Sequence, residues 1–259
     1  MTKIKIELTK SIEENASLYF DKSKKAKKKM EGALEALKKS EEKLERTKKE
    51  QKVEEEKAKE KKIVRKKQWY EKFHWFYSSE GFLCIGGRDA TSNEIVIKKH
   101  TSAEDIVFHT EMAGSPFFVV KTEGKKVGKA TLDEAAQATA AYSKAWKLGL
   151  STSEVFYVNP DQVTKEARPG EYVPRGAFMI YGKKNYIRTD VRLAVGIKNS
   201  LIIGGPVDAV KKNTDKFVIV IQGREKTSAA AKKIKHKLGG GELDDIIRML
   251  PAGGCEISK

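Results

Sequence analysis

Cysteine is scarce in this chain of 259 residues, which has only Cys84 and Cys255, and neither belongs to a CxxC pair. A disulfide framework and a cysteine zinc site are therefore not expected. Long apolar runs are missing too, since no segment approaches the roughly 18 to 20 apolar residues that cross a bilayer. Residues 1–16 lack the apolar region of a signal peptide. We expect a soluble, cytoplasmic protein that does not enter a membrane.

The sequence motifs of common catalytic sites are also missing. The four histidines are scattered, with no HxxxH or HExxH spacing to bring two of them to one metal. There is no GxSxG, no GxxxxGK[ST] and no GxGxxG that opens a helix after a strand. We therefore expect no catalytic residue, no metal and no cofactor. A nuclease or other RNA-processing enzyme that uses Asp89, His109 or Asp161 is the alternative that we rank last. Its low rank follows because no recognisable catalytic spacing joins these residues.

Acidic residues are outnumbered by basic ones, with 36 Asp and Glu against 52 Lys and Arg, which gives a net charge of +16. Such an excess is typical of proteins that bind a polyanion. Nucleic acid or the ribosome is therefore the leading class of partner.

The N-terminal part is dominated by charge, since 22 of the 30 residues from 38 to 67 are Lys, Arg or Glu. Less polar residues recur at a spacing of three and four from Ala16 to Thr47, which indicates a coiled-coil helix. Apolar residues return between Val53 and Phe76, so we predict an antiparallel helical hairpin over 1–76 with its tip near 47–58. The alternative is one long helix held by Glu and Lys pairs four residues apart.

From Tyr77 the pattern changes to short β-branched and aromatic runs separated by turn residues. A helix is predicted over 131–150, with Thr131 and Glu134 as a capping box, and two short helices separated by three glycines over 226–254. We expect an α+β fold with a mixed, largely antiparallel sheet, an RNA-binding domain over 77–190, and a β-hairpin with helices over 191–259 packed on it. Strands are predicted at 81–87, 93–100, 105–109, 115–121, 154–159, 176–182, 191–197, 199–205 and 216–223.

The segment Gly86-Gly87-Arg88-Asp89 follows a predicted strand. One interpretation is a hairpin turn in which Asp89 and Asn93 bond local backbone. The other is a phosphate site, where two glycines permit positive φ and close approach, free amides face the phosphate, and Asp89 orients the Arg88 guanidinium.

Further cations and amides lie at predicted strand ends and loops, where they suit recognition of an RNA backbone. In the basic and aromatic stretch that precedes the glycine pair, Lys66 and Lys67 are added to these candidates. Trp69, Phe73 and Phe76, at helical spacing, are assigned instead to anchoring the helical hairpin on the sheet. The candidate RNA-binding residues are Arg88, Asp89, Asn93, Lys98, Lys99, His109, Lys121, Gln162, Lys165, Lys183, Lys184 and Asn185.

An ordered set of segments closely resembles the RNA-binding R domain of the NFACT family of NEMF/RqcH-like ribosome quality control proteins. The segments are WYEKFHWFYSSEGFLCIGGRDATSNEIVIKKH, DIVFHTEMAGSPFFVVK, EAAQATAAYSKAWK, FYVNPDQVTK and GEYVPRGAFMIYGKKNYI. Residues 14–39 look like part of the family's coiled-coil middle region, and 243–257 like the C-terminus of archaeal-type members. The resemblance covers nearly the whole chain.

The resemblance implies binding to tRNA and to a large ribosomal subunit that carries a stalled peptidyl-tRNA, with support of alanyl-tRNA recruitment and C-terminal tailing. It also implies that the coiled coil reaches a protein at the ribosomal stalk base. The family's N-terminal NFACT domain and helix-hairpin-helix module have no counterpart in these residues, so tailing by this chain alone is not expected. The alternative function is a coiled-coil scaffold that docks a ribosomal protein or forms a dimer, with RNA binding secondary.

Overall fold

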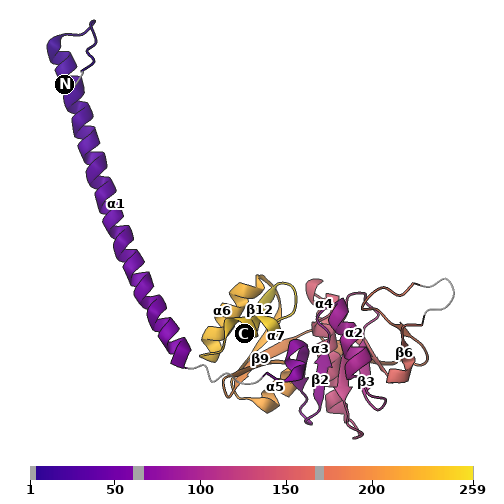
Figure 1. The fold of residues 1–259 in the computed structure, drawn as a ribbon. Coiled ribbons are helices and arrows are strands. Elements are labelled where there is room, and N and C mark those ends of the chain that lie inside the picture. The colour runs from indigo at the N-terminus through magenta and orange to yellow at the C-terminus, as the bar shows by residue number, and fades with distance from the viewer. Residues whose placement is uncertain (1–3, 61–66, 167–171, 259) are drawn as a thin grey trace. The chain divides into compact units, whose positions relative to one another are not determined.

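The computed structural model describes residues 4–60, 67–166 and 172–258 and divides the chain into two units, Met1–Lys66 and Lys67–Lys259 (Figure 1). Within residues 4–60 the first unit contains one helix, α1 (Ile12–Glu60). Ser11 caps it, because its hydroxyl accepts the amide of Glu14 at 3.1 Å while the Glu14 carboxylate accepts the amide of Ser11 at 2.8 Å. None of the described helices is long and apolar enough to cross a bilayer.

The predicted hairpin tip at 47–58 is wrong, because α1 runs through it without a break. Lys, Glu and Gln fill this segment, and these residues favour a helix even when nothing packs on it. Pairs such as Glu35 and Lys39, 2.8 Å apart, add small increments along the exposed surface. The single long helix is thus the interpretation that the structure supports as far as Glu60, and residues 61–66 lie outside the described part.

The predicted second helix of the hairpin also fails at its C-terminal end. Trp69–Lys72 forms a short 3-10 helix, η1, and His74–Tyr77 forms strand β1. Phe73 and Phe76 are buried in the core, but neither belongs to a long helix, and Trp69 is exposed. The spacing of these three rings is compatible with a helix, but β1 pairs with β2 as a strand, and both Trp75 and Phe76 are buried.

The second unit contains a six-stranded sheet in which every described pair of neighbours is antiparallel (Figure 1). This confirms the α+β class. Helix α3 (Lys129–Ala141) packs against this sheet, contacting β3, β4, β5 and β8. The single helix predicted over 131–150 is divided, because the extended residue Ser143 separates α3 from the short helix α4 (Lys144–Lys147). The strands, in spatial order, are β1, β2 (Leu83–Gly86), β4 (Phe118–Lys121), β3 (Ile106–His109), β5 (Thr152–Val158) and β8 (Asn185–Asp190).

Two other local predictions in this unit are wrong. Residues 93–100 belong to helix α2 (Ala90–His100) rather than to a strand, because Asp89 caps the helix by accepting the amide of Ser92 at 2.7 Å. Helix α3 starts two residues earlier than predicted, after Gly128. Thr131 donates instead to Glu80, and Glu134 accepts the amide of Ser79 at 2.9 Å, so both join α3 to the β1–β2 turn.

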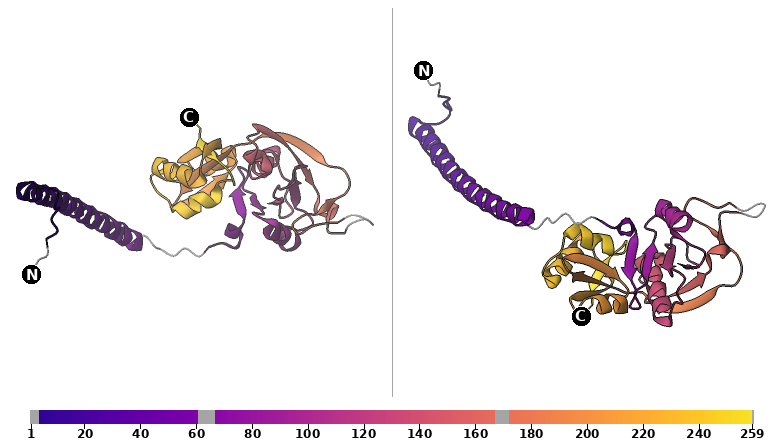
Figure 2. Two further views of the ribbon diagram at one scale, coloured as in Figure 1. Left: turned by 90° about the horizontal axis from the view of Figure 1, so that it is seen from above. Right: turned by 60° about the horizontal axis from the view of Figure 1, so that its bottom comes forward.

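A second, four-stranded antiparallel sheet forms the C-terminal part and shares one buried core with the first (Figure 2). The two predicted tail helices are confirmed, and Gly239 ends the first of them at φ 70°, a conformation that favours glycine. A two-stranded ribbon, β6 (Val163–Thr164) with β7 (Met179–Ile180), follows the 3-10 helix η2 (Pro160–Gln162). The C-terminal elements are β9 (Leu193–Lys198), β10 (Leu201–Gly205), α5 (Val207–Asn213), β11 (Phe217–Glu225), α6 (Thr227–Leu238), α7 (Leu243–Met249) and β12 (Cys255–Ile257).

Candidate nucleic-acid interface

The glycine pair after β2 provides room for side chains rather than an open phosphate cradle. Neither glycine has a positive φ. A Cβ on Gly86 would lie 2.4 Å from the ring of Phe118, and one on Gly87 would lie 1.9 Å from Oδ1 of Asn93. The amides of Arg88 and Asp89 both donate to the Ser92 hydroxyl at 2.8 Å. The predicted free amides at positive φ are therefore wrong, because the loop is the start of α2.

Arg88 and Asp89 also serve separate local purposes. Nη2 of Arg88 donates to the carbonyl of Phe73 at 3.2 Å, and burial lowers the pKa of its guanidinium. The Asp89 carboxylate accepts from Ser92, and these bonds lower its pKa. Asp89 thus caps α2 and does not orient Arg88, so the phosphate-site interpretation of this pair is wrong. Of the two, Asp89 is exposed and Arg88 is half-buried.

Asn93 and Lys121 are held inside the same region. The buried Asn93 accepts the amide of Phe117 through Oδ1 at 3.1 Å. Nζ of Lys121 donates to the His100 carbonyl at 3.0 Å and to the buried carboxylate of Asp105. Both side chains are committed to joining α2 to β4 and the loop that precedes β3.

His109 is half-buried and packs against the core. Its imidazole stacks on the ring of Phe117 with centroids 4.1 Å apart, and burial lowers the pKa of His109 to about 4. The side chain is therefore neutral at pH 7 and adds no positive charge to the surface. The imidazole of His74 is buried as well, and burial lowers its pKa well below the usual value.

Two of the predicted cations, Lys98 and Lys165, converge on one carboxylate, that of Glu94 in α2. Nζ of Lys165 lies 2.7 Å from Oε1 of Glu94, and Nζ of Lys98 lies 3.6 Å from Oε2. The hydrogen bonds from Lys165 and from the amide of Gly176 lower the pKa of Glu94 to about 2. Lys165 also lies over the ring of Phe178 at 4.6 Å. This cluster fastens the β6–β7 region to α2.

The turn before β8 holds the remaining candidates. Gln162 donates from Nε2 to the carbonyls of Tyr181 and Lys183 at 2.8 and 3.0 Å and so fixes this turn. Lys184 pairs with Glu111 at 2.8 Å and lies 4.5 Å from the ring centroid of Phe156. Lys183 and Asn185 are exposed and have no ion pair or side-chain hydrogen bond among the described residues.

The candidates thus divide by what their side chains already contact. Asn93, His109, Lys121, Gln162, Lys165 and Lys184 are engaged within the protein, and Arg88 is partly so. The exposed candidates are Asp89, Lys98, Lys99, Lys183 and Asn185. Lys67 is exposed as well, while Lys66 lies outside the described residues.

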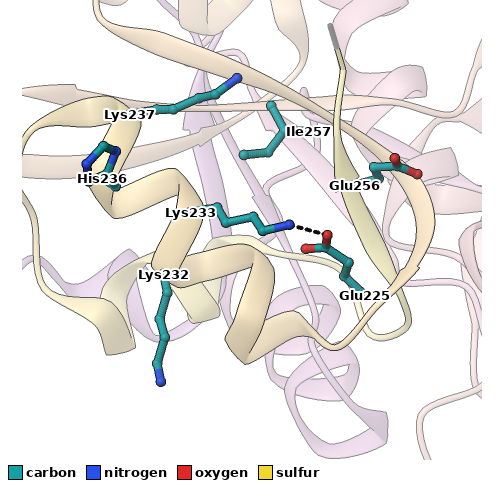
Figure 3. A pocket seen from close by; sticks show the side chains of 7 residues that line it. All are labelled: Glu225, Lys232, Lys233, His236, Lys237, Glu256 and Ile257. Atoms are coloured by element: carbon teal, nitrogen blue, oxygen red, sulfur yellow. Dashed lines mark hydrogen bonds and ion pairs between the residues drawn. The ribbon is translucent and has the colours of Figure 1, made fainter.

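A basic face on α6 was missed in the sequence, although the run KKIKHK at 232–237 carries the signal. Ala230, Ile234 and Leu238 are buried. The opposite face is exposed and borders a cleft of about 500 Å³ between α6 and the β11–β12 edge (Figure 3). Lys233 of α6 forms an ion pair with Glu225 of β11, whereas the side chain of Lys232 points away from Glu225. The exposed basic side chains of this face are Lys232, Lys233, His236 and Lys237.

Neither the exposed candidates around α2 and β8 nor the basic face of α6 has the set of donor side chains that a metal site needs. Within residues 4–60, 67–166 and 172–258, no three His, Cys, Asp or Glu side chains form a group that could hold a metal ion. Both cysteines are free and buried, and burial raises the pKa of the Cys255 thiol to about 11.

Comparison with known proteins identifies the domain. Residues 72–182 match the family described as NFACT protein RNA binding domain. The chain is similar to the archaeal Rqc2 homolog aRqcH of Methanocaldococcus jannaschii, with 42% identity over 75% of this chain and 30% of that protein. It is also similar to the ribosome quality control complex subunit NEMF homolog of Drosophila melanogaster, with 37% identity over 72% of this chain and 19% of that protein.

A third relative is the ribosome quality control complex subunit NEMF of Homo sapiens, with 37% identity over 67% of this chain and 16% of that protein. The chain therefore spans less than a third of the length of each of these relatives.

Proposed function

We propose that this chain, which is an NFACT/RqcH-like protein, acts in ribosome quality control as the part that binds tRNA and the large ribosomal subunit carrying a stalled peptidyl-tRNA. In this role it supports alanyl-tRNA recruitment and C-terminal tailing of the nascent chain, in the cytoplasm and without catalysing a reaction itself. The observation that carries the proposal is the match of residues 72–182 to an RNA-binding domain.

The net charge of +16 supports an RNA partner, because neutralising phosphates releases counterions and favours binding whatever the sequence. The contacts that we propose come from exposed ammonium groups, including that of Lys98, whose side chain is 54% exposed although it lies 3.6 Å from the Glu94 carboxylate. Lys98 and Lys99 end α2, and Lys183 lies before β8. Asn185 adds an amide that can bond phosphate or a base edge. The exposed face of α6 is a second cationic surface of the same unit.

Salt dependence of binding tests this surface. Each lost phosphate contact reduces the slope of log affinity against log salt by about 0.7 to 0.9. Lys98→Ala/Lys99→Ala should reduce the slope for tRNA by about 1.4 to 1.8 and weaken binding uniformly across RNA sequences. The matched variant Lys232→Ala/Lys237→Ala removes the same charge from α6. Equal losses from both variants would mean diffuse attraction, and no loss from the first would remove Lys98 and Lys99 from the interface.

A role on the ribosome is tested with large subunits that carry peptidyl-tRNA. The chain should sediment with these subunits, and Lys98→Ala/Lys99→Ala should reduce the bound fraction. Full-length relatives are about three to six times as long as the segment that aligns with this chain. We therefore expect this chain to act together with the further domains that those relatives contain. Tailing is therefore expected only when such domains are supplied. Failure to bind either tRNA or these subunits would refute the proposed function.

A second function, docking of a protein through α1, is favoured by the exposed apolar residues of that helix. Met30, Leu37 and Leu44 lie on the seam with three-four spacing and are 58%, 57% and 55% exposed. Such a seam is the surface on which a second helix packs in a coiled coil. Leu37→Lys/Leu44→Lys should abolish self-association or capture of a stalk-base protein, seen by sedimentation velocity, without changing tRNA affinity. Loss of tRNA affinity in this variant would contradict separate roles.

A further inference from the structure

One of the three tryptophans is on the surface. Trp69 is 46% exposed, while Trp75 and Trp146 are 6% and 1% exposed. Trp69 begins η1, just before the residues that match the RNA-binding family. Its indole stacks on the imidazole of His100, with centroids 4.4 Å apart and planes 19° apart. Because one ring face is covered in this way, the exposed area belongs to the opposite face and the ring edges.

The indole of Trp69 is held in place because its stacking partner, His100, is itself held by neighbouring residues. His100 ends α2, and its carbonyl accepts a hydrogen bond from Lys121 at 3.0 Å. The buried ring of Phe73 meets the imidazole edge-on at 5.4 Å, and Tyr70 meets the indole edge-on at 5.7 Å. A flat ring that is already held in place loses little freedom when a ligand stacks on it, which favours binding.

Positive charge surrounds this pair of rings. The pKa of His100 is lowered, first by burial and then by the nearby charges of Lys72, Lys121 and Lys99. The imidazole is therefore mainly neutral at pH 7, and the positive charge of the site resides on the lysines. Of these, Lys99 is exposed in the last turn of α2, and Lys72 is an exposed residue of η1.

We propose that the open face of Trp69 stacks on an unpaired base of the bound RNA while Lys72 and Lys99 contact the flanking phosphates. This inference rests on the proposed function and names the kind of RNA structure that the site takes. A single open ring face suits a flat ligand, and the lysines repel a cationic one and attract phosphate. Duplex RNA keeps its bases inside and offers no ring to stack, so loops, bulges and single-stranded ends are the targets.

Tryptophan fluorescence tests the stack directly. The probes are an RNA hairpin with an unpaired loop and a blunt duplex with the same number of phosphates. The hairpin should quench the emission of Trp69, and the duplex should not. In Trp69→Phe the quenching should disappear, since Trp75 and Trp146 are buried, while most of the affinity for the hairpin remains. Trp69→Ala should lose about 5- to 100-fold in affinity for the hairpin and little for the duplex, as expected for one stacked base.

The outcomes separate this inference from the proposed function. Binding of both RNAs by wild type, with Trp69→Ala unaffected or equally weakened for both, overturns the stacking inference and leaves RNA binding in place. No binding of either RNA by wild type overturns both. Loss of large-subunit binding by Trp69→Ala with unchanged hairpin affinity means that Trp69 contacts the subunit by something other than a stacked loop base, and this result also overturns the inference. Affinities of Trp69→Ala are measured well below its Tm, because loss of the stack on His100 also lowers stability.

Discussion

Replacing Lys121 by Met gives the sharpest test of whether a predicted RNA contact is a structural ion pair. The ammonium group donates to the carbonyl of His100 at 3.0 Å, to the hydroxyl of Ser102 at 3.1 Å and to the carboxylate of Asp105. The side chains of Lys121 and Asp105 are only 17% and 1% exposed. Lys121→Met keeps the aliphatic part of the side chain and removes the charge.

The expected loss of stability in Lys121→Met depends on the hydrogen bonds that the Asp105 carboxylate retains. Breaking a buried ion pair by removing one partner costs about 3 to 5 kcal/mol, because a charge is left without compensation. The carboxylate of Asp105 still accepts the amides of Ser102 at 2.7 Å and Thr122 at 3.0 Å. The loss should therefore lie near the lower end, at about 3 kcal/mol, or a fall in Tm of about 6 to 12 °C for a unit of this size.

Tryptophan emission measures this unit separately from α1, since all three tryptophans lie between Lys67 and Lys259. In urea, Lys121→Met should lower the midpoint, and Lys121→Met/Asp105→Asn should be more stable than the sum of the two single changes implies. A change in Tm of less than about 2 °C together with a reduced salt slope for RNA would refute the reasoning. Lys121 would then face RNA, as its position at a strand end had indicated.

Three further predictions concern side chains around α2 and β4. Gly87→Ala should lower Tm by several degrees in calorimetry, since its Cβ would lie 1.9 Å from Oδ1 of Asn93; an unchanged Tm would contradict this packing. Arg88→Ala should cost about 1.5 to 3 kcal/mol in urea titrations, through its lost bond to the Phe73 carbonyl, and leave the salt slope for tRNA unchanged. A reduced slope would place Arg88 on RNA. Stability should fall as pH drops from about 6.5 to 4, because the unfolded chain protonates His109 in this range while the folded pKa is about 4. His109→Gln should reduce the slope of this part of the pH profile and leave the contribution of His74, whose pKa is also lowered by burial. A wild-type profile that is already flat would contradict buried neutral imidazoles.

Strands were predictable where a β-branched run is bounded by turn residues, as in β2, β3, β4 and β11. The failure at α2 has a specific cause. Ile95, Val96 and Ile97 favour a strand locally, but Asp89 and Ser92 form a cap that starts a helix, and burial of Asn93 and Val96 then fixes it. Tertiary burial also decided β1, since the rings of Phe73 and Phe76 suit a helix spacing equally well.

The candidate residues were harder to rank because sequence shows charge and does not show partners. Lys121, Lys165 and Lys184 have the same side chain as Lys99 and Lys183, yet the first three are paired with Asp105, Glu94 and Glu111. Those carboxylates lie 16, 71 and 73 residues away along the chain, so only the fold reveals the pairing. The α6 face could have been found, because the run KKIKHK places four lysines and one histidine around the single apolar residue Ile234.

The lysines at the end of α2 have a structural role as well, and the two roles must be separated. Cations in the last turn of a helix interact favourably with its dipole by about 0.3 to 1 kcal/mol each at low salt. Lys98→Ala/Lys99→Ala should therefore reduce stability slightly even without RNA. A helix-dipole effect acts on folding and leaves the affinity of the folded protein unchanged, whereas phosphate contacts act on affinity and on its salt slope. Affinities measured well below the Tm of both proteins thus report the RNA role alone. A salt slope that is unchanged under these conditions would reduce Lys98 and Lys99 to helix-capping residues.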